Sequence, residues 1–383
     1  MQGGEEMAAN PLKALNEAGQ CVWLDNLYRD LITTGSLMHM MEDGITGITS
    51  NPTIFQKAIS GSAAYDESII MMLRKGITDP KELFLGLAME DVSRAADVLR
   101  PVYGTSKCLS GYVSIEVSPD LAHDTRGTIK EALHLFSAIN KKNILVKVPA
   151  TKEGLPAIEE LTASGVNVNV TLLFSIERYK EVAEAYIRGL EQRLRKKEQI
   201  NEIISVASFF VSRVDTLVDK LLEQRIASSS GEEKNRLTAL LGKAAVANAK
   251  LAYREYERIF TTSRFLSLKE KGANVQRLLW GSTGTKNPKY SDIKYVDELI
   301  GPDTINTMPE ATLNAFKDHG TIKITIGEQM DKAEKVLKEL ASLGISIKEV
   351  TDQLEKEGVK AFADSYFALL DEISKRRDRI HKG

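Results

Sequence analysis

The sequence predicts an α/β fold, a (β/α)8 barrel of the TIM type, and two observations lead to it. Short runs of apolar residues alternate eight times with longer stretches in which apolar residues recur every three or four positions. Polar residues collect at the ends of the short runs, where active sites of such barrels lie. We expect residues 1–383 to form a single barrel domain, because α/β barrels reach this length once insertions are included.

The short runs predict eight strands. They are residues 20–25, 44–50, 111–117, 143–148, 166–172, 202–209, 277–282 and 303–308. The stretches between them, such as DTRGTIKEALHLFSAIN, have helical periodicity. Two regions exceed a minimal barrel, since about 53–100 holds more than one helix and about 326–383 forms a helical extension. We expect the C-terminal helix that contains DSYFALLDEISKRR to pack over the chain's own barrel.

Composition limits the partners. The chain has 51 basic and 53 acidic residues and a net charge of −2, so no overall field favours nucleic acid or an acidic membrane. No run approaches 18 apolar residues, and no signal-peptide core occurs at the N-terminus. Only Cys21 and Cys108 are present, which favours a reducing compartment. We expect a soluble cytoplasmic protein, monomer or homodimer, that recognises phosphate only locally.

Lys147 lies inside the apolar run Ile144–Val148 of the fourth predicted strand. Burying a charged ammonium is costly, so this lysine must either extend to solvent or spend part of its time as a neutral amine. A neutral amine is a nucleophile, which makes Lys147 a candidate catalytic residue.

The fifth predicted strand separates polar from apolar positions. In VNVNVT, three valines alternate with Asn167, Asn169 and Thr171. Because successive side chains of a strand point to opposite faces, the valines are expected to face the helices and the polar residues the barrel interior.

The other strands end in polar residues of the same parity. These residues are Asp25, Asn51, Glu116, Lys147, Ser208 and Ser282. Each one alone has a simpler interpretation: Asp25 as a turn residue, Asn51 as the cap of a helix that begins at Pro52, Glu116 as a solvated strand end. Their agreement on one end of one barrel favours a shared active site.

No metal and no cofactor is expected. The five histidines lack metal-ligand spacing, and His123 has no His or carboxylate cluster on adjacent strands. Neither a GxGxxG after the first strand nor a GxxxxGK[ST] occurs, so nothing indicates a nucleotide cofactor.

Several motifs together resemble the transaldolase family. They are GITGITSNPTIFQKAI, VSIEVSPDLAHD, ILVKVPAT, VNVNVTLLFS, SVASFFVSRVD and LLWGSTGTKNPKYSD, in this order from about Gln20 to Asp318. The length and LWGSTGTKNP are similar to the longer transaldolase subfamily. The resemblance implies a (β/α)8 barrel that acts through a lysine Schiff base without a metal or cofactor.

The resemblance also implies roles for single residues. Lys147 would form the Schiff base, Asp25 would move the C4 hydroxyl proton, and Glu116 and Thr171 would hold a water that shuttles protons. The substrate-binding residues would be Asn51, Asn169, Ser208 and Phe210, and the phosphate-binding residues Arg213, Ser282 and Lys286. One position departs from the pattern, because shorter members have an arginine where this chain has Lys286. We expect Asp25 and Glu116 near Lys147 but not both paired with it.

The implied reaction transfers a dihydroxyacetone unit from sedoheptulose 7-phosphate or fructose 6-phosphate to glyceraldehyde 3-phosphate or erythrose 4-phosphate, in the non-oxidative pentose phosphate pathway. Two alternatives remain open from the sequence. The barrel could act as a fructose 6-phosphate aldolase-type lyase that releases the unit to water, or it could be a non-catalytic sugar-phosphate-binding barrel.

Overall fold

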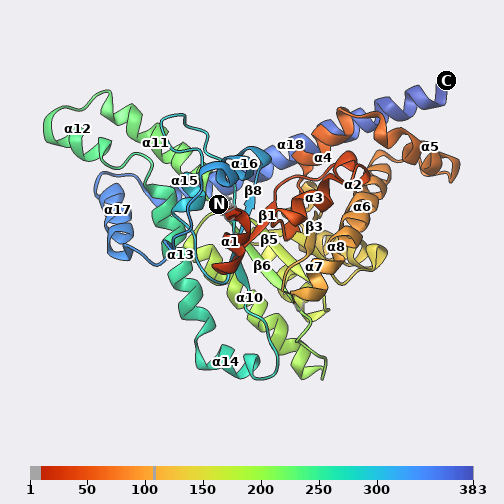
Figure 1. Ribbon diagram of the computed structural model, residues 1–383, viewed down its shortest axis with the longest axis horizontal. Coiled ribbons are helices and arrows are strands. Elements are labelled where there is room, and N and C mark those ends of the chain that lie inside the picture. Colours follow the sequence, from red (N-terminus) through yellow and green to blue (C-terminus); the bar gives the residue numbers. More distant parts are fainter. Residues whose placement is uncertain (1–9, 107–108, 383) are drawn as a thin grey trace, which may run out of the picture.

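The computed structural model describes residues 10–106 and 109–382, and Cys108 lies outside these ranges. Eight parallel strands form a closed barrel in chain order, surrounded by helices (Figure 1). The strands are β1 (Gln20–Leu24), β2 (Gly47–Ile48), β3 (Tyr112–Glu116), β4 (Ile144–Pro149), β5 (Val168–Leu173), β6 (Ser205–Phe210), β7 (Arg277–Gly281) and β8 (Thr304–Met308). The predicted fold class and all eight predicted strands are confirmed.

The largest difference from the prediction is β2, which has two residues where 44–50 was expected. The residues just before and just after β2 still form backbone hydrogen bonds to β1, since Thr46 N donates to Val22 O and Thr49 N donates to Leu24 O. The predicted range therefore follows the extended chain, and only its centre keeps regular pairing on both sides.

The helices occupy the connections between strands and the region after β8. Those up to β4 are α1 (Pro11–Glu17), α2 (Arg29–Thr33), α3 (Ser36–Glu42), α4 (Pro52–Ser60), η1 (Ala63–Tyr65), α5 (Asp66–Arg74), α6 (Pro80–Val98), α7 (Arg100–Thr105), η2 (Pro119–Leu121) and α8 (Thr125–Ile139). The later ones are α9 (Gly154–Ala163), α10 (Ile176–Arg195), α11 (Ser212–Ile226), α12 (Gly231–Thr238), α13 (Ala244–Phe260), α14 (Ser263–Lys269), α15 (Lys294–Asp297), α16 (Glu310–His319), α17 (Met330–Ser342) and α18 (Ile347–Lys382). None of the helices in the described ranges has the length and apolar content needed to cross a bilayer.

The barrel interior is closed by large side chains below the level of the polar residues. Trp23 is completely buried and packs in an apolar cluster with Leu145, Val206 and Leu279 from other strands. Gly47 faces the Trp23 indole so closely that a Cβ at this position would lie 2.5 Å from the ring. The tryptophan therefore requires glycine on the neighbouring strand, and the interior is a packed core with an open end only at the carboxyl ends of the strands.

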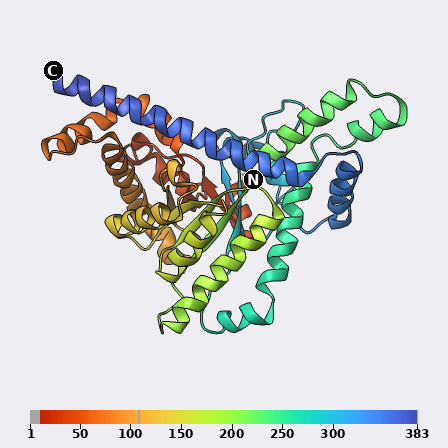
Figure 2. The ribbon, with the colours of Figure 1, turned by 180° about the vertical axis from the view of Figure 1, so that it is seen from behind.

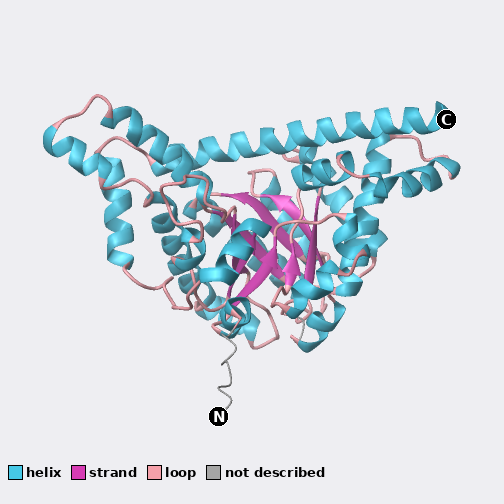
Figure 3. Ribbon diagram, turned by 45° about the horizontal axis from the view of Figure 1, so that its top comes forward, coloured by secondary structure: helices cyan, strands magenta, loops and turns pink. Residues whose placement is uncertain are grey.

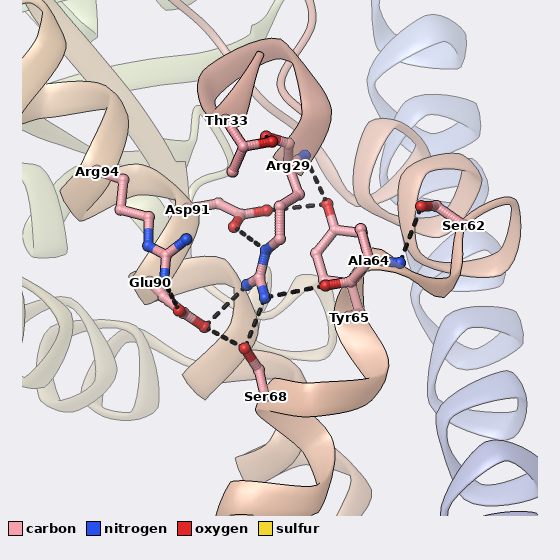
Figure 4. Close-up of polar contacts among 9 residues, drawn as sticks. All are labelled: Arg29, Thr33, Ser62, Ala64, Tyr65, Ser68, Glu90, Asp91 and Arg94. Atoms are coloured by element: carbon pink, nitrogen blue, oxygen red, sulfur yellow. Dashed lines mark hydrogen bonds and ion pairs between the residues drawn. The ribbon is translucent and has the colours of Figure 1, made fainter. Parts of the chain in front are cut away.

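A buried ion cluster fastens the helices between β2 and β3 to the start of the chain (Figure 4). Arg29 of α2 donates from Nε to Asp91 Oδ1 at 2.9 Å and from Nη2 to Glu90 Oε2 at 2.8 Å. Tyr65 OH donates to the other oxygen of Asp91 at 2.9 Å and accepts from Arg29 N at 3.1 Å. Ser68 Oγ accepts from Arg29 Nη1 at 2.6 Å and donates to Glu90. The cluster ties α2, η1, α5 and α6 together.

The long helix α18 crosses the open end of the barrel (Figures 2 and 3). Its apolar face is buried through Phe362, Tyr366, Leu369 and Ile373. Gly358 permits this close approach, since a Cβ there would lie 2.9 Å from Leu172 Cδ2 at the end of β5. The expected packing of the C-terminal helix over the chain's own barrel is confirmed.

Candidate active site

A cavity of about 290 Å³ lies at the carboxyl ends of the strands, beneath α18. Eight of the predicted site residues line it: Asp25, Asn51, Lys147, Ser208, Phe210, Arg213, Ser282 and Lys286. The other three, Glu116, Asn169 and Thr171, are buried in the strands beside it. The structure therefore brings the predicted set to one end of one barrel, as the strand parity indicated.

Lys147 is the most enclosed cation of this group, with 4 % of its surface exposed. It lies on β4 in register with Glu116 of β3 on one side and Asn169 of β5 on the other. Its Nζ donates to the backbone oxygen of Ser50 at 2.8 Å and lies 3.3 Å from Glu116 Oε2. Glu116 is thus paired with the lysine, whereas no oxygen of Asp25 comes within ion-pair distance among the described residues. This agrees with the expectation that the two acids are not both paired with it.

Asp25 and Glu116 lie on the same side of Lys147 along the barrel wall, because β3 is the strand next to β4 and β1 lies two strands further on. Burial raises the pKa of the Asp25 carboxyl, while the charge of Lys147 and a hydrogen bond from Thr49 oppose that rise. Thr49 Oγ1 lies 2.8 Å from Asp25 Oδ1 and 2.6 Å from Thr307 Oγ1. Burial likewise raises the pKa of Glu116 against the attraction of Lys147. Both carboxyls are therefore shifted toward the range useful for proton transfer.

Thr171 and Glu116 keep hydrogen-bonding capacity inside the barrel. Thr171 Oγ1 is fully buried and has no hydrogen-bond partner in the described part of the chain. Glu116 Oε2 makes no hydrogen bond to those residues beyond its contact with Lys147. The register of β5 against β6 shifts after Val170, and Leu172 adopts a positive φ of 55°, so Thr171 lies at an irregular strand end. Buried polar atoms without partners are rare and indicate a ligand or water position.

Asn169 is held in the barrel interior by both of its amide atoms. Its Nδ2 donates to Ser114 Oγ at 3.0 Å, and its Oδ1 accepts from Ser208 Oγ at 2.6 Å. The amide is fully buried, and its register places it next to Lys147. Ser208 also lines the cavity, so this pair forms part of the wall on the β6 side.

Asn51 is a helix cap, which is the simpler interpretation that its sequence allowed. Its Oδ1 accepts from Ile54 N at 3.0 Å and caps α4, which begins at Pro52. The residue nevertheless lines the cavity, and the cap occupies only the amide oxygen. Its Nδ2 group donates no hydrogen bond to a described residue and is the part left available to a ligand.

The far end of the cavity is cationic. The Arg213 guanidinium lies between two rings, 5.4 Å from the centroid of Phe210 and 6.0 Å from that of Phe362. Lys286 lines the same cavity, and desolvation together with the positive charge of Arg213 lowers its pKa. Ser282 takes a positive φ of 54° and its Oγ lies 2.9 Å from Ser212 Oγ. The two cations and the serine hydroxyl at this end are complementary to an anionic group.

Ten residues that line the cavity were not predicted as site residues, and four of them have side chains suited to contact a ligand: Thr49, Lys57, Thr307 and Phe362. Thr49 and Thr307 lie at inward strand ends, so the same parity rule would have found them. Lys57 lies six residues beyond Asn51 on α4, a helix that the sequence predicted, so helical periodicity could have placed it near the cavity. Phe362 had no local signal, because only the path of α18 brings it to the barrel.

In the described ranges, no three His, Cys, Asp or Glu side chains form a group that could hold a metal ion. His123 instead pairs with Glu153 at the surface, with Nδ1 3.1 Å from Oε2.

A buried lysine paired with a carboxyl, at the open end of a (β/α)8 barrel and in one cavity with an arginine and two further lysines, is an arrangement typical of enzymes that act on anionic substrates. Residues 22–373 match the transaldolase/fructose-6-phosphate aldolase family. The chain belongs to this family.

Relatives align over almost the whole chain. A protein named transaldolase 2 from Nostoc sp. is 45 % identical over 372 residues, which cover 96 % of this chain and 97 % of the relative. A transaldolase from Trichodesmium erythraeum is 44 % identical and covers 98 % and 99 % of the two chains. A transaldolase from Parafrankia sp. is 47 % identical and covers 95 % and 97 %.

Proposed function

We propose that this protein is a transaldolase, a transferase that moves a dihydroxyacetone unit from a ketose phosphate to an aldose phosphate through a Schiff base on Lys147. The observation that carries the proposal is the enclosed Lys147, which faces the cavity together with Asp25 and has Glu116 at 3.3 Å. The donors would be sedoheptulose 7-phosphate or fructose 6-phosphate, and the acceptors glyceraldehyde 3-phosphate or erythrose 4-phosphate.

In this mechanism the neutral amine of Lys147 attacks the ketone carbon to form a carbinolamine, which loses water to give an iminium ion. Glu116 is suited to this stage, because its Oε2, whose contact in the described ranges is Lys147, and the unpartnered Thr171 hydroxyl can hold a water that carries protons. Asp25 then removes the proton of the C4 hydroxyl as the C3–C4 bond breaks. The bonding electrons pass to the iminium, which leaves an enamine and releases an aldose phosphate.

The enamine attacks the carbonyl carbon of the acceptor, Asp25 returns the proton to the new hydroxyl, and water releases the product from Lys147. We assign Asn51, Asn169 and Ser208 to the hydroxyls of the dihydroxyacetone unit and Phe210 to its apolar side. Arg213, Ser282 and Lys286 are assigned to the phosphate. Support for these assignments comes from the cavity lining and from the strand register.

The lyase alternative requires water to reach the enamine before an acceptor does. Phe362 of α18 lines the cavity and covers Arg213, which limits the approach of water from above. The relatives named above are transaldolases. Transfer to an acceptor is therefore favoured over release to water. A barrel that only binds a sugar phosphate would not need a buried lysine paired with a buried Glu116, next to a buried Thr171 hydroxyl that has no partner in the described ranges.

We also infer that the partners are sugar phosphates and that the protein acts in the cytoplasm, as its cysteine usage favours. The chain is proposed to be one barrel domain, to which about 53–100 and about 326–383 are helical additions. The contacts of α18 with α4, α6 and α11 support this division.

Trapping tests the proposal directly. The protein is incubated with fructose 6-phosphate, reduced with borohydride, and digested with trypsin. Reduction of a Schiff base on Lys147 blocks cleavage there, so the adduct is expected on the peptide 143–152, NILVKVPATK. An adduct on Lys152 would appear on the peptide 148–178 and would contradict the assignment. The Lys147→Met variant should give no adduct, with turnover lower by about 10⁴-fold or more.

A coupled assay separates transfer from release. With fructose 6-phosphate alone, wild-type protein should produce glyceraldehyde 3-phosphate only slowly, and erythrose 4-phosphate should accelerate production many-fold. Equal rates with and without the acceptor would establish the lyase instead.

A further inference from the structure

We propose that Lys57 of α4 is a phosphate-binding residue, and that it forms with Arg213 and Lys286 a site of three cations for the phosphate of donor and acceptor. The inference rests on the proposed function, because the phosphate is taken to belong to a sugar phosphate bound at Lys147. It adds a residue from the helix after β2 to a site otherwise built from β6 and β7 and the segments that follow them.

The three cations have no carboxylate partner. In the described ranges, no Asp or Glu oxygen lies within ion-pair distance of Lys57, Arg213 or Lys286, although many other Lys and Arg side chains there form such pairs. None of the three side chains donates a hydrogen bond to a described residue. A guanidinium has five N–H donors and an ammonium three, and all three cations line one cavity. Arg213 is partly buried, whereas Lys57 and Lys286 are exposed. Such an arrangement is complementary to a phosphate dianion.

The position of Lys57 fits the length of the substrate. Helix α4 begins beside the reacting lysine, since Lys147 Nζ bonds to Ser50 O and Asn51 is the cap of the helix. Thr53, Ile54 and Lys57 face the cavity from successive turns. Six residues separate Lys57 from Asn51, which is a rise of about 9 Å along the helix. At roughly 1.3 Å per bond, the seven bonds from the ketone carbon to phosphorus in sedoheptulose 7-phosphate span about 9 Å, and the six bonds in fructose 6-phosphate span about 8 Å.

The composition of the site explains why a third cation is useful. The basic residue of the β7–α15 segment is Lys286, which offers a point charge and lacks the planar fork of an arginine. Desolvation and the neighbouring charge of Arg213 lower the pKa of Lys286. Lys57 approaches from the opposite wall and supplies positive charge without adding to the crowding of Arg213 and Lys286.

A structural role for Lys57 is the competing interpretation. The residue lies in the last turn of α4, where a cation also interacts favourably with the helix carbonyls. That role would make Lys57 matter for stability and leave substrate affinity unchanged. The two interpretations therefore differ in what a substitution alters.

The test compares kcat/KM for erythrose 4-phosphate with that for erythrose as acceptors. Donor and acceptor react in turn with one covalent enzyme, so kcat/KM for the acceptor does not depend on the donor. In Lys57→Met the ratio of the two values should fall about tenfold, because only the phosphorylated acceptor loses a contact. Lys57→Arg should restore most of the ratio. Lys75→Met, at an exposed lysine of the same region that lies away from the cavity, should leave it unchanged.

An unchanged ratio in Lys57→Met would overturn the inference, and so would an equal loss for both acceptors. A lower melting temperature with an unchanged ratio would identify the structural role. Calorimetric titration with inorganic phosphate gives a readout that needs no turnover. Weaker phosphate binding by Lys57→Met would support the inference even if the protein had no transaldolase activity, so failure of the proposed function is distinguishable from failure of this site.

Discussion

The protein contains two clusters built around a buried cation, and they differ in how many of their hydrogen-bonding positions are occupied: Arg29 pairs with two carboxyls, and Lys147 pairs with one, Glu116. Around Arg29, Asp91 uses both oxygens, Glu90 is bonded, and Tyr65 and Ser68 occupy the remaining positions (Figure 4). Around Lys147, one oxygen of Glu116 has only the lysine, and the hydroxyl of Thr171 has no partner among the described residues. The first cluster is closed by its own chain, whereas the second leaves room for atoms that the chain does not supply.

This difference separates stability from chemistry. A fully bonded buried ion cluster fixes the geometry of the helices that meet there, and removal of one member leaves a charge without compensation. An incompletely bonded cluster contributes less to folding but can exchange protons and ligands. The same residue types therefore serve two purposes, and the number of free hydrogen-bonding positions indicates which.

Arg29→Met should give the largest effect on stability. The substitution leaves Asp91, which is completely buried, without its cation, and we expect the free energy of unfolding to fall by about 3–5 kcal/mol. Urea unfolding measures this change. The control Arg94→Met removes a half-exposed partner of Glu90 and should cost about 1 kcal/mol or less. Loss of turnover in folded Arg29→Met, with stability unchanged, would break the comparison.

Asp215 provides a third case, a buried carboxyl that has hydrogen bonds and no ion pair among the described residues. Its Oδ1 accepts from Ala245 N at 2.7 Å and its Oδ2 from Tyr295 OH at 2.9 Å, and burial raises its pKa to about 6. The folded state thus binds the proton more tightly than the unfolded state between about pH 4 and 6. Stability should fall as the pH rises through this window, by about 3 kcal/mol in total.

The variant Asp215→Asn should lack this dependence. Urea unfolding at pH 4.5, 5.5, 6.5 and 7.5 should show that the free energy of unfolding of wild type, minus that of the variant, decreases with pH. If this difference in the free energy of unfolding did not change with pH, hydrogen bonds alone would keep the Asp215 carboxylate ionised. A buried carboxyl with hydrogen bonds would then behave like one that is paired with a cation.

Thr171→Val should give the smallest change and the sharpest contrast. Valine has the shape of threonine and removes a hydroxyl that has no partner in the described ranges, so the free energy of unfolding should stay the same or rise by less than about 1 kcal/mol. If the hydroxyl holds the water of the Schiff-base stage, kcat should fall about 10- to 100-fold. A large loss of stability would show that Thr171 belongs to the framework, as Asp91 does.

Much of the fold followed from the sequence because the barrel imposes a simple rule. Parallel strands alternate inward and outward residues, so polar residues at inward strand ends had to meet at one end. This rule placed Asp25, Lys147 and Ser208 at the cavity without knowledge of any contact. Strand ends were less predictable, as β2 shows, because regular pairing depends on both neighbouring strands.

The contribution of α18 followed only in part. Its helical periodicity was visible, but nothing local indicated that Phe362 would meet Arg213, which is far away in the sequence. The identity of Asn51 as both a cap and a lining residue was also open, because one side chain can serve the backbone with its oxygen and the cavity with its nitrogen. Long-range packing and shared side chains are decided in three dimensions.

The order of the elements along the chain sets the order in which the site is made. The last barrel strand, β8, ends at Met308, and the helix that carries Phe362 follows only at the C-terminal end of the described chain. Because domains begin to fold during synthesis from the N-terminal side, the barrel can assemble while its cover is still on the ribosome. The cavity that contains Lys147 is covered last, so a translation product that ends before α18 would present a barrel with this cavity open to solvent.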